Sequence, residues 1–199
     1  MKLGNIANVR SGLVLSRKQA REYSEIQYPL LNFRAINASG YVKKNELDVF
    51  NAAEYLSKDY LSQEGDIIVR LTAPYTAILI DKETEGMVIS SNFLIIRTDY
   101  TVLLPEYLFW LLNSAKVKKS IYENTSSNML GAIKTKFFSD FEVHLLSIKE
   151  QRKIAEMNAL ALREAILLQR LAEEKEKYYG LLIEQTHNEM KRGNIYDES

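Results

Sequence analysis

The chain has 199 residues, of which 46% are hydrophobic and 26% charged, and its formal net charge is zero. This length suits one ordinary hydrophobic core with an appendage, and the zero net charge argues against a general polyanion binder. There is no cysteine, which excludes disulfides and thiolate chemistry. No stretch approaches the roughly 18 apolar residues of a membrane span. We therefore expect a soluble, cytoplasmic protein without membrane contact.

The first 145 residues have the mixed pattern of an α+β domain. The dipeptides Ser11-Gly12 and Glu64-Gly65 are turn signals between short apolar runs. An extended run covers 28–37, and 75–80 and 87–90 are predicted to pair around a polar hairpin loop at 81–86. Further strands or extended segments are predicted at 66–70, 92–97 and 137–143. Pro105 opens a predicted helix over 106–113, a second helix covers 115–122, and 124–131 has the composition of a loop.

One long helix is predicted over residues 146–192. Ser147 and Glu150 have the spacing of a capping box, and no proline follows before Lys191. Gly180 is a weak point, worth roughly 1 kcal/mol against alanine, where the helix is open to bending. Arg192-Gly193-Asn194 predicts the stop and leaves 193–199 as a tail. About 44 residues in one helix give a rod of about 65 Å, longer than the helices of compact domains.

This helix carries an apolar stripe that it cannot bury by itself. Hydrophobic side chains recur at helical spacing on a broad face suited to packing against another helix. We therefore predict that the long helix packs against a helix of a partner, either a second copy of the chain or another protein. The predicted interface residues are Ile154, Met157, Ala161, Leu168, Leu171, Tyr178 and Leu182.

Enzymatic motifs are missing from the sequence. No two glycines form a Gly-x-Gly pair, so neither a dinucleotide-binding fingerprint nor a phosphate-binding loop is present. His144 and His187 are isolated and have no cysteine partners, which argues against a zinc site. The carboxylates at 66, 81, 83 and 85 are the candidates for a metal-dependent nuclease site, but the start of a strand and a solvated hairpin explain them more simply. We expect a non-catalytic protein with no cofactor and no metal.

Polar and basic side chains at strand ends and in loops are the candidate binding residues. Arginine and asparagine form bidentate contacts with guanine and adenine, whereas lysine, serine and threonine anchor phosphates. Residues 1–138 carry 17 Lys/Arg against 14 Asp/Glu, so any contact with nucleic acid depends on local groups, although such groups are usually just solvated. The predicted DNA-binding residues are Arg17, Lys18, Arg34, Asn37, Arg70, Thr72, Tyr75, Ser127, Asn128, Lys134 and Lys136.

An ordered set of short motifs resembles the target recognition domain of the specificity subunit of type I restriction-modification enzymes. These motifs are Lys2-Leu3-Gly4-Asn5-Ile6-Ala7-Asn8-Val9-Arg10-Ser11-Gly12, Tyr28-Pro29-Leu30-Leu31, Gly65-Asp66-Ile67-Ile68-Val69, Ser91-Asn92-Phe93-Leu94-Ile95-Ile96-Arg97, Pro105-Glu106-Tyr107-Leu108 and Leu130-Gly131-Ala132-Ile133-Lys134. Glu150-Gln151-x-x-Ile154-Ala155 resembles the start of the spacer helix of that family. No single motif is specific, but together they cover nearly all of the chain.

The resemblance implies a non-catalytic subunit that reads double-stranded DNA. Complete family members hold two recognition domains apart on two antiparallel helices, each domain reads half of a split target, and methyltransferase and restriction/translocase subunits assemble on this scaffold. This chain has one recognition domain and one helix, which implies a half-subunit. Its long helix would pack in an antiparallel coiled coil, in a homodimer or with another half-subunit. A two-fold pair predicts an interrupted palindrome with half-sites roughly one to two turns apart.

The sequence departs from the family pattern at one further place, and one alternative function remains. His144-Leu145-Leu146-Ser147 replaces the proline-rich segment that precedes the helix in the family, so the angle between domain and helix does not follow from the resemblance. The alternative function is a non-catalytic adaptor that binds protein through its domain and oligomerises through its helix. The near-neutral charge of the domain favours the adaptor, and the ordered motifs favour DNA binding.

Overall fold

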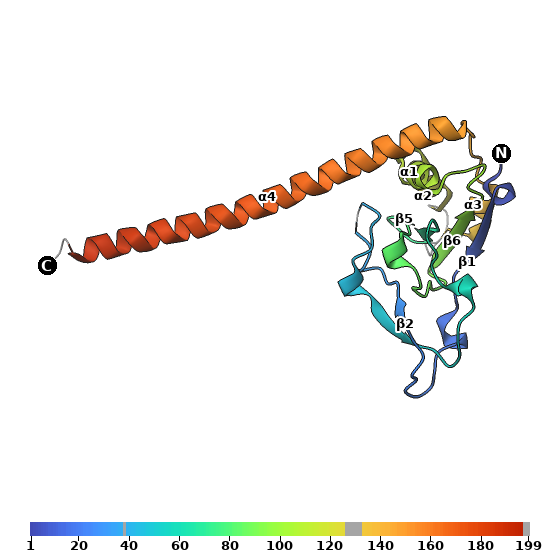
Figure 1. Ribbon diagram of the computed structural model, residues 1–199, viewed down its shortest axis with the longest axis horizontal. Coiled ribbons are helices and arrows are strands. Elements are labelled where there is room, and N and C mark those ends of the chain that lie inside the picture. Colours follow the sequence, from blue (N-terminus) through green and yellow to red (C-terminus); the bar gives the residue numbers. More distant parts are fainter. Residues whose placement is uncertain (38, 126–132, 197–199) are drawn as a thin grey trace. The chain divides into compact units, whose positions relative to one another are not determined.

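The computed structural model describes residues 1–37, 39–125 and 133–196, with side chains up to Lys191. It divides into two units, Met1–Ala155 and Glu156–Ser199. The first unit is a domain of mixed sheet and helix, and the second continues one long helix, α4 (Ile148–Tyr196) (Figure 1). The predicted α+β domain followed by a long helix is therefore confirmed.

A four-stranded antiparallel sheet forms the centre of the first unit. Its strand order is β1-β6-β4-β5, formed by β1 (Ala7–Ser11), β6 (Phe93–Thr98), β4 (Ile67–Arg70) and β5 (Ala77–Leu79). Ile67, Ile68 and Val69 of β4 are completely buried, so both faces of this central strand are covered. The predicted strands 66–70 and 92–97 correspond to β4 and β6.

Helices contact both edge strands of this sheet. α1 (Pro105–Asn113) contacts β5 and β4, and α2 (Ala115–Thr125) packs against α1 (Figure 1). Both helices confirm the prediction, with Pro105 in the first turn of α1, where its missing N–H leaves no hydrogen bond unmade. α3 (Thr135–Asp140) contacts β1, so the extended segment predicted over 137–143 is wrong for 137–140. The remainder is extended, and Glu142 forms an antiparallel bridge with Lys2. The short helix buries Phe138 completely and stacks Phe137 near Phe141, with ring centroids 6.4 Å apart.

A second, two-stranded sheet pairs β2 (Gln27–Leu30) with β3 (Asp48–Asn51). Residues 87–90 join it to the core, because Val88 forms bridges with Leu30 and with Leu61. The predicted hairpin between 75–80 and 87–90 is wrong, since β5 pairs with β4 instead. The cause is local: the Asp81 carboxylate accepts hydrogen bonds from the backbone N–H groups of Glu83 and Thr84, which winds 82–84 into a 3₁₀ turn.

The start of α4 is anchored in the first unit. Ser147 and Glu150 form the predicted capping box: the Glu150 carboxylate accepts from Ser147 N at 2.9 Å, and Glu150 N donates to Ser147 Oγ at 3.4 Å. Gln151 is fully buried, and its side chain bonds to Leu104 N and to the carbonyls of Val102 and Leu146. These contacts fix where the helix begins.

α4 then runs for 49 residues, a length of about 73 Å. Gly180 lies inside the helix without a break, and the helix continues beyond the stop predicted at 192–194 to Tyr196. Among the described helices, none combines the length and hydropathy that crossing a membrane requires.

Candidate nucleic-acid interface

The side chain of Arg70, at the end of β4, is held in place by two neighbours. Its Nε donates a hydrogen bond to Thr72 Oγ1 at 3.1 Å, and its guanidinium carbon lies 4.0 Å from the centroid of the Phe33 ring. Phe33 in turn packs against Phe93 of β6, with ring centroids 5.2 Å apart. A stacked and hydrogen-bonded arginine is pre-oriented, so little side-chain entropy is lost when it binds a planar acceptor.

The loop after Arg70 is hydrogen-bonded to the end of α2 and to the segment that precedes α3. Tyr75 is buried, has a φ of 54°, and donates its hydroxyl hydrogen to Thr125 Oγ1 at the end of α2 (3.0 Å). Ile133 N donates to the carbonyl of Leu71 at 2.9 Å. Thr125 and Ile133, which flank residues 126–132, are thus both hydrogen-bonded to the loop that follows Arg70. Tyr75 is only 6% exposed, so its side chain is largely out of reach of a ligand.

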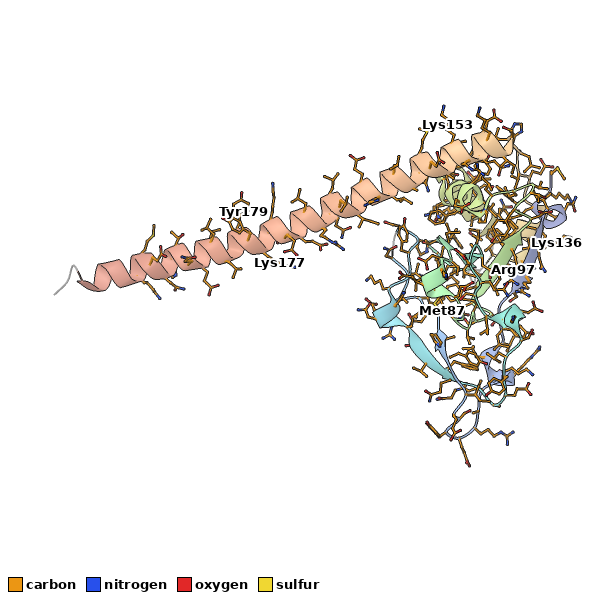
Figure 2. All side chains as sticks on the ribbon, viewed as in Figure 1. Met87, Arg97, Lys136, Lys153, Lys177 and Tyr179 are labelled. Carbon is orange, nitrogen blue, oxygen red and sulfur yellow. The ribbon has the colours of Figure 1, made fainter. Side chains whose placement is uncertain are left out.

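Lys134 and Lys136 continue from this junction and are both exposed. They line a hollow of about 440 Å³ together with Asn124, Phe137 and Asp140. Asp140 is committed to Lys2, at 2.8 Å, and the hydrogen bond from Lys2, with a smaller contribution from the charge of Lys136, lowers the pKa of its carboxyl group. In the part of the chain that the structure describes, neither Lys134 nor Lys136 is in an ion pair, so both charges are available to an anion. Lys136 is labelled in Figure 2.

The other predicted DNA-binding residues fall into separate groups. Arg34 follows Phe33 and pairs with Asp48 at 2.8 Å, yet its side chain is 73% exposed. The Asn37 side chain accepts from Tyr41 N at 2.8 Å and closes a turn. Arg17 is exposed, and Lys18 pairs with Glu54 beyond β3. The structure therefore brings Arg70, Thr72, Tyr75 and Lys134 to one place, with Arg34 adjoining through Phe33, whereas Ser127 and Asn128 lie outside the described residues.

Phe33 was not among the predicted DNA-binding residues. Its ring is 37% exposed and supports Arg70, so it is an additional candidate for contact with a ligand. An aromatic residue between Asn32 and Arg34 in a run of mixed polarity was the available signal. The contact with Arg70 depends on tertiary structure and could not be read from spacing.

Structural roles account for Asp66, Asp81 and Glu83, three of the carboxylates that could have formed a nuclease site. Asp66 is completely buried and accepts two hydrogen bonds from Arg97, at 2.7 and 2.8 Å, and this hydrogen bonding raises the pKa of Arg97. Asp81 caps the 3₁₀ turn, and Glu83 pairs with Lys44 at 2.6 Å. No group of three or more potential metal ligands occurs among the described residues.

The predicted interface residues on α4 lie along its exposed length. The exposed fractions are 63% for Met157, 60% for Leu168, 52% for Leu171, 61% for Tyr178 and 43% for Leu182. Ala161 is also exposed, and Ile154 is half-buried near the start of the helix. Apolar side chains in such number on one helix are the kind of surface that binds a partner.

Comparison with known proteins gives matches in structure only. No protein-family model matches the chain, and no curated protein matches its sequence. The HsdS subunit of Thermoanaerobacter tengcongensis superposes with a TM-score of 0.63 at 20% identity, over 92% of this chain and 46% of that subunit. A chain from a structure on complex assembly and conformational transition of the type I R-M system gives 0.62 at 21% identity, with the same coverage.

The chain has the fold of about half of a type I specificity subunit. It spans about half the length of the subunits it matches, at 46% of each of those two chains. The S subunit of the type I restriction-modification system of M. genitalium is a more distant match, with a TM-score of 0.50, 14% identity and coverage of 82% of this chain and 39% of that subunit. The resemblance of the sequence to type I specificity subunits is therefore confirmed at the level of fold.

Proposed function

We propose that this chain is a non-catalytic, sequence-specific DNA-binding specificity subunit of a type I restriction-modification system. Residues 1–145 would read one half of a bipartite target, and residues 146–192 would act as spacer and pairing helix. The observation that carries the proposal is the match of 92% of the chain to about half of a specificity subunit. Methyltransferase and restriction/translocase subunits would dock on the assembled pair, and the chain itself would need no cofactor.

Arg70 and its neighbours have the chemistry for reading DNA. A guanidinium held over the Phe33 ring would offer its two terminal N–H groups to the O6 and N7 atoms of guanine. Lys134 and Lys136, without ion-pair partners among the described residues, suit contacts with the phosphate backbone, which set affinity rather than sequence. Base reading and phosphate anchoring thus meet at one place on the first unit.

Two substitutions test these roles against each other. Arg70→Ala should lower affinity by roughly 1–3 kcal/mol at one base position of the target. Lys134→Ala should weaken binding to all duplexes about equally and reduce the slope of log affinity against log salt by about 1. Lys82→Ala, an exposed lysine on the 82–84 turn, is the matched control and should bind as the unchanged chain does. Fluorescence anisotropy with target and scrambled duplexes at several salt concentrations measures all three.

The adaptor function gives the opposite result. If the chain binds no duplex at low salt, or if all three variants bind alike, the DNA-reading role of this site is wrong. The adaptor would then be favoured, with its domain binding a protein.

A split target requires two recognition domains, and residues 1–145 would form one of them. The exposed apolar stripe of α4 is a surface through which two such domains could be brought together. We therefore propose that function requires pairing through α4.

A further inference from the structure

A narrow seam runs inside the broad apolar stripe of α4. From Ile154 and Met157 to Leu182 and Gln185, its members follow one another at alternating spacings of three and four residues. This is the heptad repeat by which two helices interlock side chains. Two members are charged, Glu164 and Lys175, and all the others between Ile154 and Leu182 are hydrophobic.

Neither charge in the seam is satisfied within the chain. Glu164 and Lys175 are exposed, and no ion pair or side-chain hydrogen bond involves them in the described part of the molecule. By contrast, Lys177 lies off the seam and pairs with Glu174 at 2.9 Å. Figure 2 shows Lys177 and Tyr179 pointing to opposite sides of the helix. Burying one charge of the seam in an interface without the other would be unfavourable, so each requires an opposite charge on its partner helix.

A second copy in antiparallel orientation meets this requirement. When the two-fold axis passes between Gln169 and Arg170, Glu164 of each copy faces Lys175 of the other. The same axis places Leu168 opposite Leu171 and Met157 opposite Leu182, so the apolar members also face one another. One symmetry operation thus satisfies both charges and buries the leucines at the centre.

Other arrangements of two copies fail on the same residues. A shift of one heptad places Glu164 opposite Leu168 or Leu182, and Lys175 opposite Met157 or Leu171. A parallel pair in register places Glu164 opposite Glu164 and Lys175 opposite Lys175, which is repulsive at both layers. Both alternatives leave buried charges without opposite partners.

We propose that the seam of α4 is occupied by a second copy of this chain, antiparallel, in a register set by Glu164 and Lys175. This deepens the pairing in the proposed function and rests on it. In this register the two copies of Ile148 lie about 65 Å apart along the paired helices. The charge pair acts as a specificity device, since it selects one orientation and one register from several that the apolar residues alone would allow.

Charge reversal of the full chain tests the orientation. Glu164→Lys or Lys175→Glu alone should weaken self-association by roughly tenfold or more, because two attractive layers become repulsive. The double variant with both reversals should regain the original association constant. Glu184→Lys, on the opposite side of the helix, is the matched control and should associate normally. Sedimentation equilibrium measures the constants, and circular dichroism checks that each variant retains its helix.

A parallel pair gives a different pattern in the same experiment. Like charges would face each other in every variant, so neither the single nor the double reversal would change the association constant. That result would overturn the proposal, as would a chain that remains monomeric at micromolar concentration or that associates only with a different protein.

Cysteine crosslinking tests the register independently, because the chain contains no cysteine of its own. A mixture of Met157→Cys and Leu182→Cys chains should form a disulfide-linked dimer on oxidation, whereas each variant alone should not. Crosslinking of Met157→Cys to itself would indicate a parallel pair, and no crosslinking in the mixture would exclude this register. None of these readouts uses DNA. A correctly paired dimer that binds no DNA would refute the proposed function, and a DNA-binding monomer would refute the register.

Discussion

Asp66 and Arg97 link the two central strands of the sheet. Asp66 is completely buried at the start of β4, and both of its carboxylate oxygens accept from Arg97 on β6, at 2.7 and 2.8 Å. The carboxylate also accepts from Gln63 N, which fixes the turn before β4. A buried carboxylate with this many donors is stable only while its partner remains, so the pair commits the sheet to one register.

We predict that Arg97→Met lowers the free energy of unfolding of the chain by about 3–5 kcal/mol, because it leaves the Asp66 carboxylate buried without its counter-charge. Arg34→Met removes an exposed ion pair with Asp48 and should cost about 1 kcal/mol or less. Urea denaturation followed by the fluorescence of Trp110 compares the two variants. Equal, small effects would show that the buried pair contributes no more than a surface pair.

At the scale of elements, Gln151 holds the start of α4. Its side-chain amide replaces water for three backbone groups, at Val102, Leu104 and Leu146. In the Gln151→Leu variant, leucine has a volume similar to that of glutamine but leaves the three backbone groups without hydrogen bonds. We expect this variant to lower the free energy of unfolding by roughly 2–4 kcal/mol. Gln169→Leu, which removes only an exposed hydrogen bond to Glu173, is the control. If the two variants unfold at the same urea concentration, the anchoring role of Gln151 is refuted.

The capping box adds a pH dependence at the same place. Donation from the Ser147 hydroxyl, and secondly from its backbone N–H, lowers the pKa of Glu150. A carboxyl group whose pKa is lowered in the folded state stabilises that state above the pKa of the unfolded chain, about 4.3. This contribution is lost as the pH falls through the lower, folded-state pKa. Ser147→Ala should therefore return the pKa of Glu150, measured by NMR titration, toward its ordinary value. An unchanged pKa in this variant would contradict the capping box.

The sequence predicted correctly those helices and strands that are marked by a local signal, such as a cap, a proline or an apolar run. The capping box at Ser147, the proline that opens α1 and the apolar runs of β4 and β6 all appear where expected. The errors fall where a short local contact overrides the pattern. Asp81 winds the chain into a turn where a hairpin was expected, and α3 is six residues long, too short for helical periodicity to show.

The candidate site was less accessible to prediction, because it is assembled from segments far apart in the sequence. Spacing identified Arg70 and Lys134 as candidates but gave no reason to join them; the bond between Ile133 N and the Leu71 carbonyl does so. Phe33 was missed because its role depends on the Arg70 guanidinium above its ring. Tyr75 was predicted to contact DNA through its hydroxyl group, but that group is buried and donates a hydrogen bond to Thr125.

At the scale of the whole molecule, the proposed function combines a DNA-reading first unit with the exposed helix α4. An antiparallel pair has two-fold symmetry, and its two recognition domains should therefore prefer inverted copies of one half-site. The bases between the half-sites would lie beyond the reach of either domain. Their number should be fixed, because the paired helices have a fixed length.

Selection of bound duplexes from a random library with the purified chain tests this account most directly. We predict enrichment of an inverted repeat in which two identical half-sites are separated by a spacer of constant length and no sequence preference. Glu164→Lys, which weakens the pair, should lose the spacing constraint while any enrichment that remains keeps the half-site. A single uninterrupted motif, or no enrichment over the starting library, would contradict the account.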